Sequence, residues 1–146
     1  MFHFPFCPIC AAEPNSHSFH VIPSQNINIR LFYSCPAKAT KYFEPEGVIN
    51  HFDFVLKQNN HYPWAWVFDC DGFTLAHASQ VKTSISIADL ISNKYGENLK
   101  KVWIINPTWS INLVLKAMWP ILPDRLRNVI EKTDKTLEEI QQMPLF

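Results

Sequence analysis

Residues 64–72 read WAWVFDCDG, and this stretch decides the fold. Apolar residues run without interruption from Trp64 to Phe68, preceded by Pro63 and followed by the polar turn 69–72. A half-buried strand alternates apolar and polar residues, whereas a strand buried on both faces has no polar position. The stretch therefore predicts a central strand of a parallel sheet.

A second apolar run, VWII at 102–105, is closed by Asn106 and Pro107. Upstream, Ile27, Ile29 and Leu31 alternate with polar residues, as in a half-buried strand. Apolar residues at helical spacing fill much of the rest. We predict strands at 26–34, 64–68, 102–105 and 128–132, and helices at 44–58, 75–93, 111–122 and 136–142. This alternation predicts an α/β fold with a mostly parallel sheet covered by helices.

The composition limits the classes of protein to consider. The 146 residues are 47% hydrophobic and 18% charged, which suits one domain with one core. Lys and Arg number 13, as do Asp and Glu, and this zero net charge argues against a nucleic-acid binder. We see no secretory signal or membrane span in the sequence. We expect a cytoplasmic protein with reduced thiols, and peripheral membrane contact as an alternative.

Four segments carry a resemblance to a known family. They are WVFDCDG at 66–72, YGENL at 95–99, VWIINPTW at 102–109 and LKAMWPIL at 115–122. In this order they resemble the CRAL-TRIO lipid-exchange family, over about residues 26–144. The resemblance implies a CRAL-TRIO-like domain, which we place at 21–146, after an irregular N-terminal arm or metal knuckle at 1–20.

The helix at 111–122 is apolar almost all round, with Asn112 and Lys116 as its polar positions. Such a helix is buried on every side or faces lipid, and a plain core helix is the simpler alternative. The resemblance implies that a phospholipid or similar hydrophobic molecule binds beneath it, without catalysis, for exchange, sensing or presentation. The residues that we expect to contact this ligand are Trp66, Phe68, Val114, Leu115, Met118 and Trp119.

Two other functions remain to be weighed. The family has a divergent branch that binds small GTPases and other proteins, so a protein-interaction module with a cavity filled by its own side chains is the main alternative. Asp69 and Asp71 follow a buried strand, where open α/β sheets often bind ligands. Turn-forming Asp residues before Gly72 explain them more simply. Because no nucleophile motif accompanies them, we predict that the protein is not an enzyme.

The N-terminal arm contains Cys7-Pro8-Ile9-Cys10. A Cys-x-x-Cys pair can place two thiolates on one zinc ion, and His17 and His20 are close enough in sequence to complete four ligands. The alternative is two unliganded cysteines with histidines at the surface. The sequence leaves both open, so we assign it no metal ligand and no cofactor.

Overall fold

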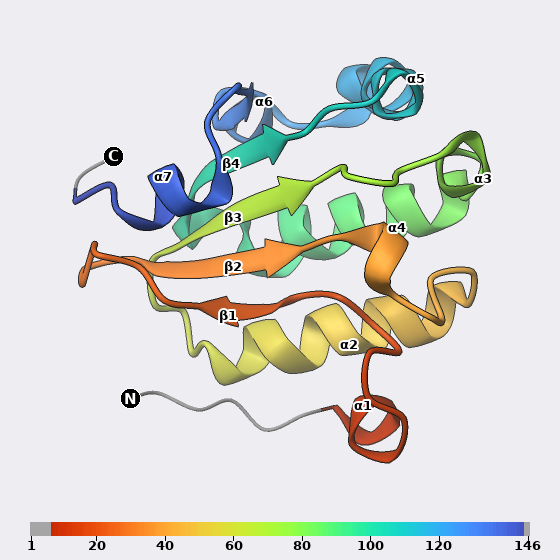
Figure 1. The fold of residues 1–146 in the computed structure, drawn as a ribbon, viewed down its shortest axis with the longest axis horizontal. Coiled ribbons are helices and arrows are strands. Elements are labelled where there is room, and N and C mark those ends of the chain that lie inside the picture. The colour runs from red at the N-terminus through yellow and green to blue at the C-terminus, as the bar shows by residue number, and fades with distance from the viewer. Residues whose placement is uncertain (1–6, 145–146) are drawn as a thin grey trace.

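The computed structural model describes residues 7–144, and within them the chain forms one five-stranded sheet in the order β1-β2-β3-β4-β5 (Figure 1). Strand β1 pairs with β2 in the antiparallel sense, and β2 to β5 pair in parallel. The strands are β1 His20–Ile22, β2 Arg30–Ser34, β3 Trp64–Asp69, β4 Leu99–Ile105 and β5 Ile130–Lys132. The predicted α/β fold with a mostly parallel sheet is confirmed.

Helices connect the parallel strands. Residues 45–58 join β2 to β3, residues 75–95 join β3 to β4, and residues 109–127 join β4 to β5. The α-helices are α1 Pro8–Ala12, α2 Pro45–Gln58, α3 Leu75–Ala78, α4 Val81–Leu90, α5 Trp109–Met118, α6 Asp124–Arg127 and α7 Leu137–Gln141. A π turn, Ile91–Tyr95, follows α4, and a 3₁₀ turn, Trp119–Ile121, follows α5.

The two faces of the sheet are covered by different helices. Successive parallel strands are neighbours, and crossovers of one hand place their connecting helices on the same face. Phe32, Trp64 and Trp66 accordingly form a core with residues of α2 and α4 on that face. Leu31, Tyr33, Ala65, Val67, Trp103 and Ile105 point the other way and pack against Ile140 of α7. Because side chains alternate along a strand, both faces of β3 are apolar, as its sequence requires.

Two strands differ from the sequence predictions. The strand predicted at 26–34 begins only at Arg30, and Ile27 is 85% exposed. The side chain of Asn26 accepts a hydrogen bond from the backbone N–H of Asn28 at 3.0 Å, so a local turn replaces the start of the strand. Residues 20–22 form the edge strand β1, which was not among the strands predicted from the sequence.

The α-helices at 75–93 and 111–122 are shorter than the sequence predicts. The helix expected at 75–93 is broken at residues 79–80 into α3 and α4. The helix expected at 111–122 begins earlier, at Trp109, and its α-helical part ends at Met118 because Pro120 has no backbone N–H to donate. Within the described part of the N-terminal arm, residues 7–19, the only helix or strand is the five-residue α1. No helix among residues 7–144 has the length and hydropathy needed to cross a membrane.

Candidate functional site

A cavity of about 140 Å³ lies between the sheet and helices α4 and α5. Its walls come mainly from β3, β4, α4 and α5, with further residues from α2 and from the loop that follows β2. The lining is mostly apolar, and among the described residues it includes no Asp, Glu, Lys or Arg side chain. A cavity of this kind favours a hydrophobic occupant, because an apolar wall cannot compensate the desolvation of a charged one.

Five of the six residues predicted to contact a ligand line this cavity. Trp66 and Phe68 reach it from β3, two residues apart on one face of the sheet. Val114, Leu115 and Met118 reach it from α5, on the helix face that is turned toward the sheet. The sixth, Trp119, lies in the 3₁₀ turn after α5, is 40% exposed and does not line the cavity. The ligand contacts themselves stay predictions.

Helix α4 supplies a wall that was not among the predicted ligand contacts. Ile87 and Ala88 of α4, with Ile91 at the start of the π turn that follows it, line the cavity opposite α5. Their spacing of one and four residues marks an apolar helix face, and this signal is visible in the sequence. The sequence does not reveal that this face meets α5 across a gap rather than in close contact.

The few polar groups that line the cavity belong to serine, tyrosine and histidine side chains, and the hydroxyls of Ser18 and Ser34 accept hydrogen bonds. Trp66 donates its indole N–H to the Ser34 hydroxyl at 2.8 Å, and the Cys35 backbone N–H donates to the Ser18 hydroxyl at 2.9 Å. Burial raises the pKa of Tyr42 to about 12, so its phenol is uncharged at neutral pH. These groups can orient a polar end of a ligand without requiring that it be charged.

The outer side of α5 is unusually apolar for an exposed surface. Ile111 is buried against the core, but Trp109 is 68% exposed and Leu113, one turn further on, is 43% exposed. Ile121, in the turn that follows, is 55% exposed. Helix α5 therefore has an apolar side toward the cavity and further apolar side chains that are open to the surroundings.

The carboxylate of Asp69 serves to hold the ends of β3 and β4 together. It accepts hydrogen bonds from the Tyr33 hydroxyl at 2.6 Å, the Asn106 side-chain amide at 3.0 Å and the Asp71 backbone N–H at 2.9 Å. Asn106 has a positive φ of 49°, which its amide contact helps to stabilise. These contacts match the turn-forming interpretation of Asp69.

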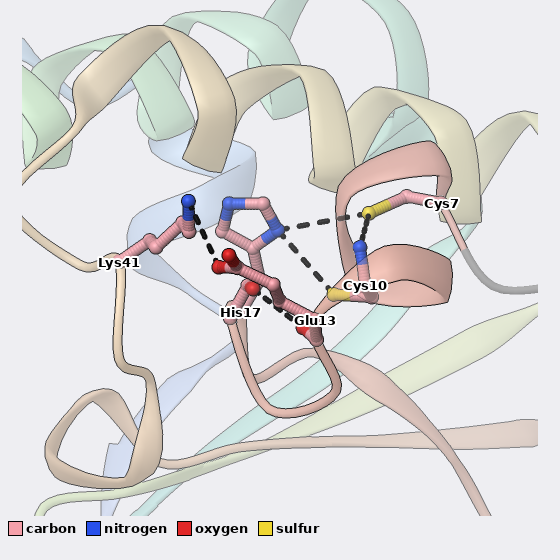
Figure 2. A network of polar contacts seen from close by, with 6 residues as sticks. Cys7, Cys10, Glu13, His17 and Lys41 are labelled. Carbon is pink, nitrogen blue, oxygen red and sulfur yellow. Dashed lines mark hydrogen bonds and ion pairs between the residues drawn. The ribbon is translucent and has the colours of Figure 1, made fainter.

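A second cluster of functional side chains lies beside the cavity, at the N-terminal arm. Cys7, Cys10, His17 and His51 are all buried, and one potential ligand atom of each lies within 4.8 Å of the others. Figure 2 shows Cys7 and Cys10 at the first turn of α1, with the ring of His17 turned toward both sulfur atoms. His17 also lines the cavity, so the two features share a wall.

The fourth member of this cluster is His51 rather than His20, which corrects the ligand set suggested by the sequence. His20 begins β1, and its ring packs beside that of Tyr33. Because strand residues alternate, Phe19 enters the core beneath the helices while His20 points away from it. His51 comes from the buried face of α2, beside Phe52, and this placement of a polar residue on an apolar face is the only sign of it in the sequence.

Comparisons with known proteins agree with this fold. The CRAL/TRIO domain model matches residues 16–143. The structure is similar to the crystal structure of Sfh5, with a TM-score of 0.67 at 9% sequence identity, over 90% of this chain. The chain covers 52% of that structure, so it spans about half of its length. No curated protein sequence matches the chain significantly.

CRAL/TRIO domains bind lipids and other hydrophobic small molecules, and they are mainly transfer and binding proteins rather than enzymes. The match over residues 16–143 spans most of the sequence, including the sheet and both walls of the cavity. The chain therefore belongs to the CRAL/TRIO domain family.

Proposed function

We propose that this protein binds one lipid-like molecule in the cavity beneath α5 and exchanges it with a membrane surface, without changing it covalently. The observation that carries this proposal is the uncharged, mostly apolar cavity between α4, α5 and the sheet. Burial of apolar ligand surface there would contribute about 25 cal/mol per Å² to binding.

The size of the cavity implies that α5 moves when a lipid binds. At about 140 Å³ it is close to the roughly 150 Å³ of a cavity that holds a benzene-sized molecule. A lipid with long acyl chains is much larger and needs α5 to be displaced outward. Pro107 before α5 and Pro120 after it interrupt regular structure at both ends, so the helix can move as a unit.

The exposed apolar side chains of Trp109, Leu113 and Ile121 support contact with a membrane. Tryptophan suits the membrane–water interface because its ring is apolar and carries one N–H donor. Lys116, exposed on the same helix, and Arg125 after it can approach lipid phosphates. Membrane contact on this side would place the moving helix next to the source of its ligand.

A protein-interaction module is the second candidate, favoured by a mostly apolar groove on the surface. The groove lies between α3, the start of α4 and α5, where Leu75, Val81 and Leu113 are exposed. An interaction module whose own side chains fill the cavity would not leave the space that lies beneath α5. A partner such as a small GTPase would bind this groove whether or not lipid is present.

The test is uptake of a fluorescent phospholipid from vesicles by Leu115→Asp, with Asn112→Asp as its matched control. Both changes add one negative charge to α5, but Leu115 lines the cavity whereas Asn112 is exposed and contacts Lys132. A buried carboxylate costs several kcal/mol. We expect Leu115→Asp to lose about 10-fold or more in uptake, and Asn112→Asp to keep it.

Far-UV circular dichroism and cooperative urea unfolding would establish that both variants are folded. Wild-type uptake by folded Leu115→Asp would refute the location of the site. Absence of uptake by the wild-type protein, with binding of a protein partner that a Leu113 substitution removes, would favour the interaction module.

A further inference from the structure

The Cys7, Cys10, His17 and His51 cluster has the composition of a closed metal site. Two cysteine sulfurs and two imidazole nitrogens converge, and no carboxylate belongs to the group. Soft sulfur donors combined with imidazole select zinc over magnesium or calcium, which prefer oxygen. The four residues come from α1, the loop after it and α2, so a shared ion would link segments that are up to 44 positions apart in sequence.

Three contacts within the cluster have the lengths expected around a tetrahedral ion, and all four potential ligand atoms lie within 4.8 Å of one another. Nδ1 of His17 lies 3.7 Å from Sγ of Cys7 and 3.5 Å from Sγ of Cys10, and Nδ1 of His51 lies 3.8 Å from Sγ of Cys10. Zinc bonds of about 2.3 Å to sulfur and 2.0–2.1 Å to nitrogen give ligand-to-ligand distances of about 3.3–3.8 Å in a tetrahedron. The three contacts therefore require little rearrangement to accept the ion.

The local backbone positions the sulfur atoms of Cys7 and Cys10. Cys7 caps α1, Pro8 occupies the first turn, and the backbone N–H of Cys10 donates to Sγ of Cys7 at 3.3 Å. This contact holds the Cys7 side chain toward the helix, on the side from which Cys10 projects (Figure 2). An amide N–H directed at a thiolate also stabilises its negative charge.

The surroundings of His17 and His51 also favour metal binding. Nε2 of His51 lies 2.8 Å from the carbonyl oxygen of Phe19, so Nε2 carries the proton and Nδ1 turns its lone pair to the cluster. Metal-bound histidines commonly donate their second N–H in this way. The ring of His17 is buried, and its Nε2 has no hydrogen-bond partner among the described residues. Coordination through Nδ1 would compensate part of the cost of burying that ring.

We propose that Cys7, Cys10, His17 and His51 bind one structural zinc ion that fastens the N-terminal arm to α2. The site uses four protein ligands and leaves no position for water, which distinguishes a structural zinc site from a catalytic one. Two thiolates neutralise the charge of the ion, so the buried site carries no net charge. His17 also lines the cavity, so the ion would hold part of the cavity wall in place.

The experiment measures metal in the full chain by inductively coupled plasma mass spectrometry, after expression in zinc-supplemented medium and purification under reducing conditions. About one zinc per chain is expected. Metal-free protein, prepared by unfolding with chelator and refolding, should bind cobalt(II) and develop the visible absorption of tetrahedral cobalt with thiolate ligands. These two measurements need no substitution, so they stand even if a variant fails to fold.

Variants then identify the ligands. Cys10→Ser and His51→Ala should each weaken zinc binding by about 100-fold or more, measured by competition with a chromophoric chelator. Cys35→Ser and His20→Ala change the same residue types outside the cluster, and they should bind as the wild-type protein does. Retained affinity in His51→Ala together with loss in His20→Ala would overturn the ligand set.

Two results would overturn the metal site itself. One is only trace zinc in the purified protein together with no cobalt absorption after refolding. The other is a mass two hydrogens lower than the reduced chain, with Cys7 and Cys10 joined in a disulfide, in protein kept under reducing conditions. Neither measurement involves lipid, so failure of the metal site and failure of the proposed lipid binding are distinguishable.

Discussion

Filling the cavity is the most direct test of whether it is empty space that a ligand can use. Ala88 lies on α4, and its side chain lines the cavity. Ala88→Phe would place an aromatic ring in the space that faces α5. If the cavity is the ligand site, this ring competes with lipid and also replaces empty volume with packed atoms.

The size of the effect follows from the cavity volume. An unfilled cavity costs about 24 cal/mol per Å³, so about 140 Å³ costs the ligand-free protein about 3 kcal/mol. A single ring recovers part of this, and we expect Ala88→Phe to raise the free energy of unfolding by about 1–2 kcal/mol. For a chain of this size that is an increase in Tm of roughly 3–7 °C.

The assay is urea unfolding of lipid-free protein, followed by circular dichroism, with and without added phospholipid vesicles. Lipid should raise the midpoint of the wild-type protein because it binds only the folded state, and this gain should be lost in Ala88→Phe. Ala76→Phe makes the same change at an exposed position of α3 and should leave the lipid effect intact. A loss of about 1–3 kcal/mol in Ala88→Phe would indicate an already packed core and refute the reasoning.

Two further changes test the interior of the same domain. The hydroxyl of Thr83 is fully buried on α4 with no hydrogen-bond partner among the described residues. Thr83→Val removes this hydroxyl and should raise the free energy of unfolding in urea by about 1 kcal/mol. A decrease would mean that the hydroxyl has a hydrogen-bond partner. The Tyr95 hydroxyl donates to Asp53 at 2.5 Å, and mainly through this bond lowers the pKa of that carboxyl below its usual value. A lowered carboxyl pKa stabilises the protein above the unfolded-state pKa, and this contribution is lost as pH falls through the folded-state pKa. In urea unfolding, Asp53→Asn should therefore lose less stability than the wild-type protein as the pH falls below about 4. An identical dependence of the free energy of unfolding on pH in the two proteins would contradict this.

The sequence predicted the centre of the sheet well because its strands are buried on both faces. Such strands must be apolar at every position, so β3 and β4 stand out without knowledge of their neighbours. The edge strand β1 was missed because it has only three residues and pairs with β2 alone, so its sequence carries little periodic pattern. The false start of β2 at residue 26 has a similar cause, since Ile27 and Ile29 alternate as in a strand but local turn bonds prevail.

The cavity was partly predictable for a related reason. Residues two apart on a strand, or four apart on a helix, share a face, so Trp66 with Phe68 and Val114 with Met118 could be grouped from their spacing. The sequence does not state how closely two such faces approach. That depends on the side chains of α4, α5 and the sheet together, and it decides whether they touch or leave about 140 Å³ between them.

The proposed metal-binding cluster was predictable from the sequence only in part. Cys7 and Cys10 are three residues apart, and His17 is close in the chain, so local spacing was enough to group them. His51 reaches the cluster only because α2 packs against the sheet and turns that residue toward Phe19 and the arm. Local sequence periodicity therefore determined most of the elements and their buried faces, and four short segments carried the family resemblance. Only the tertiary structure decided which distant side chains meet, because that contact depends on how whole elements pack together.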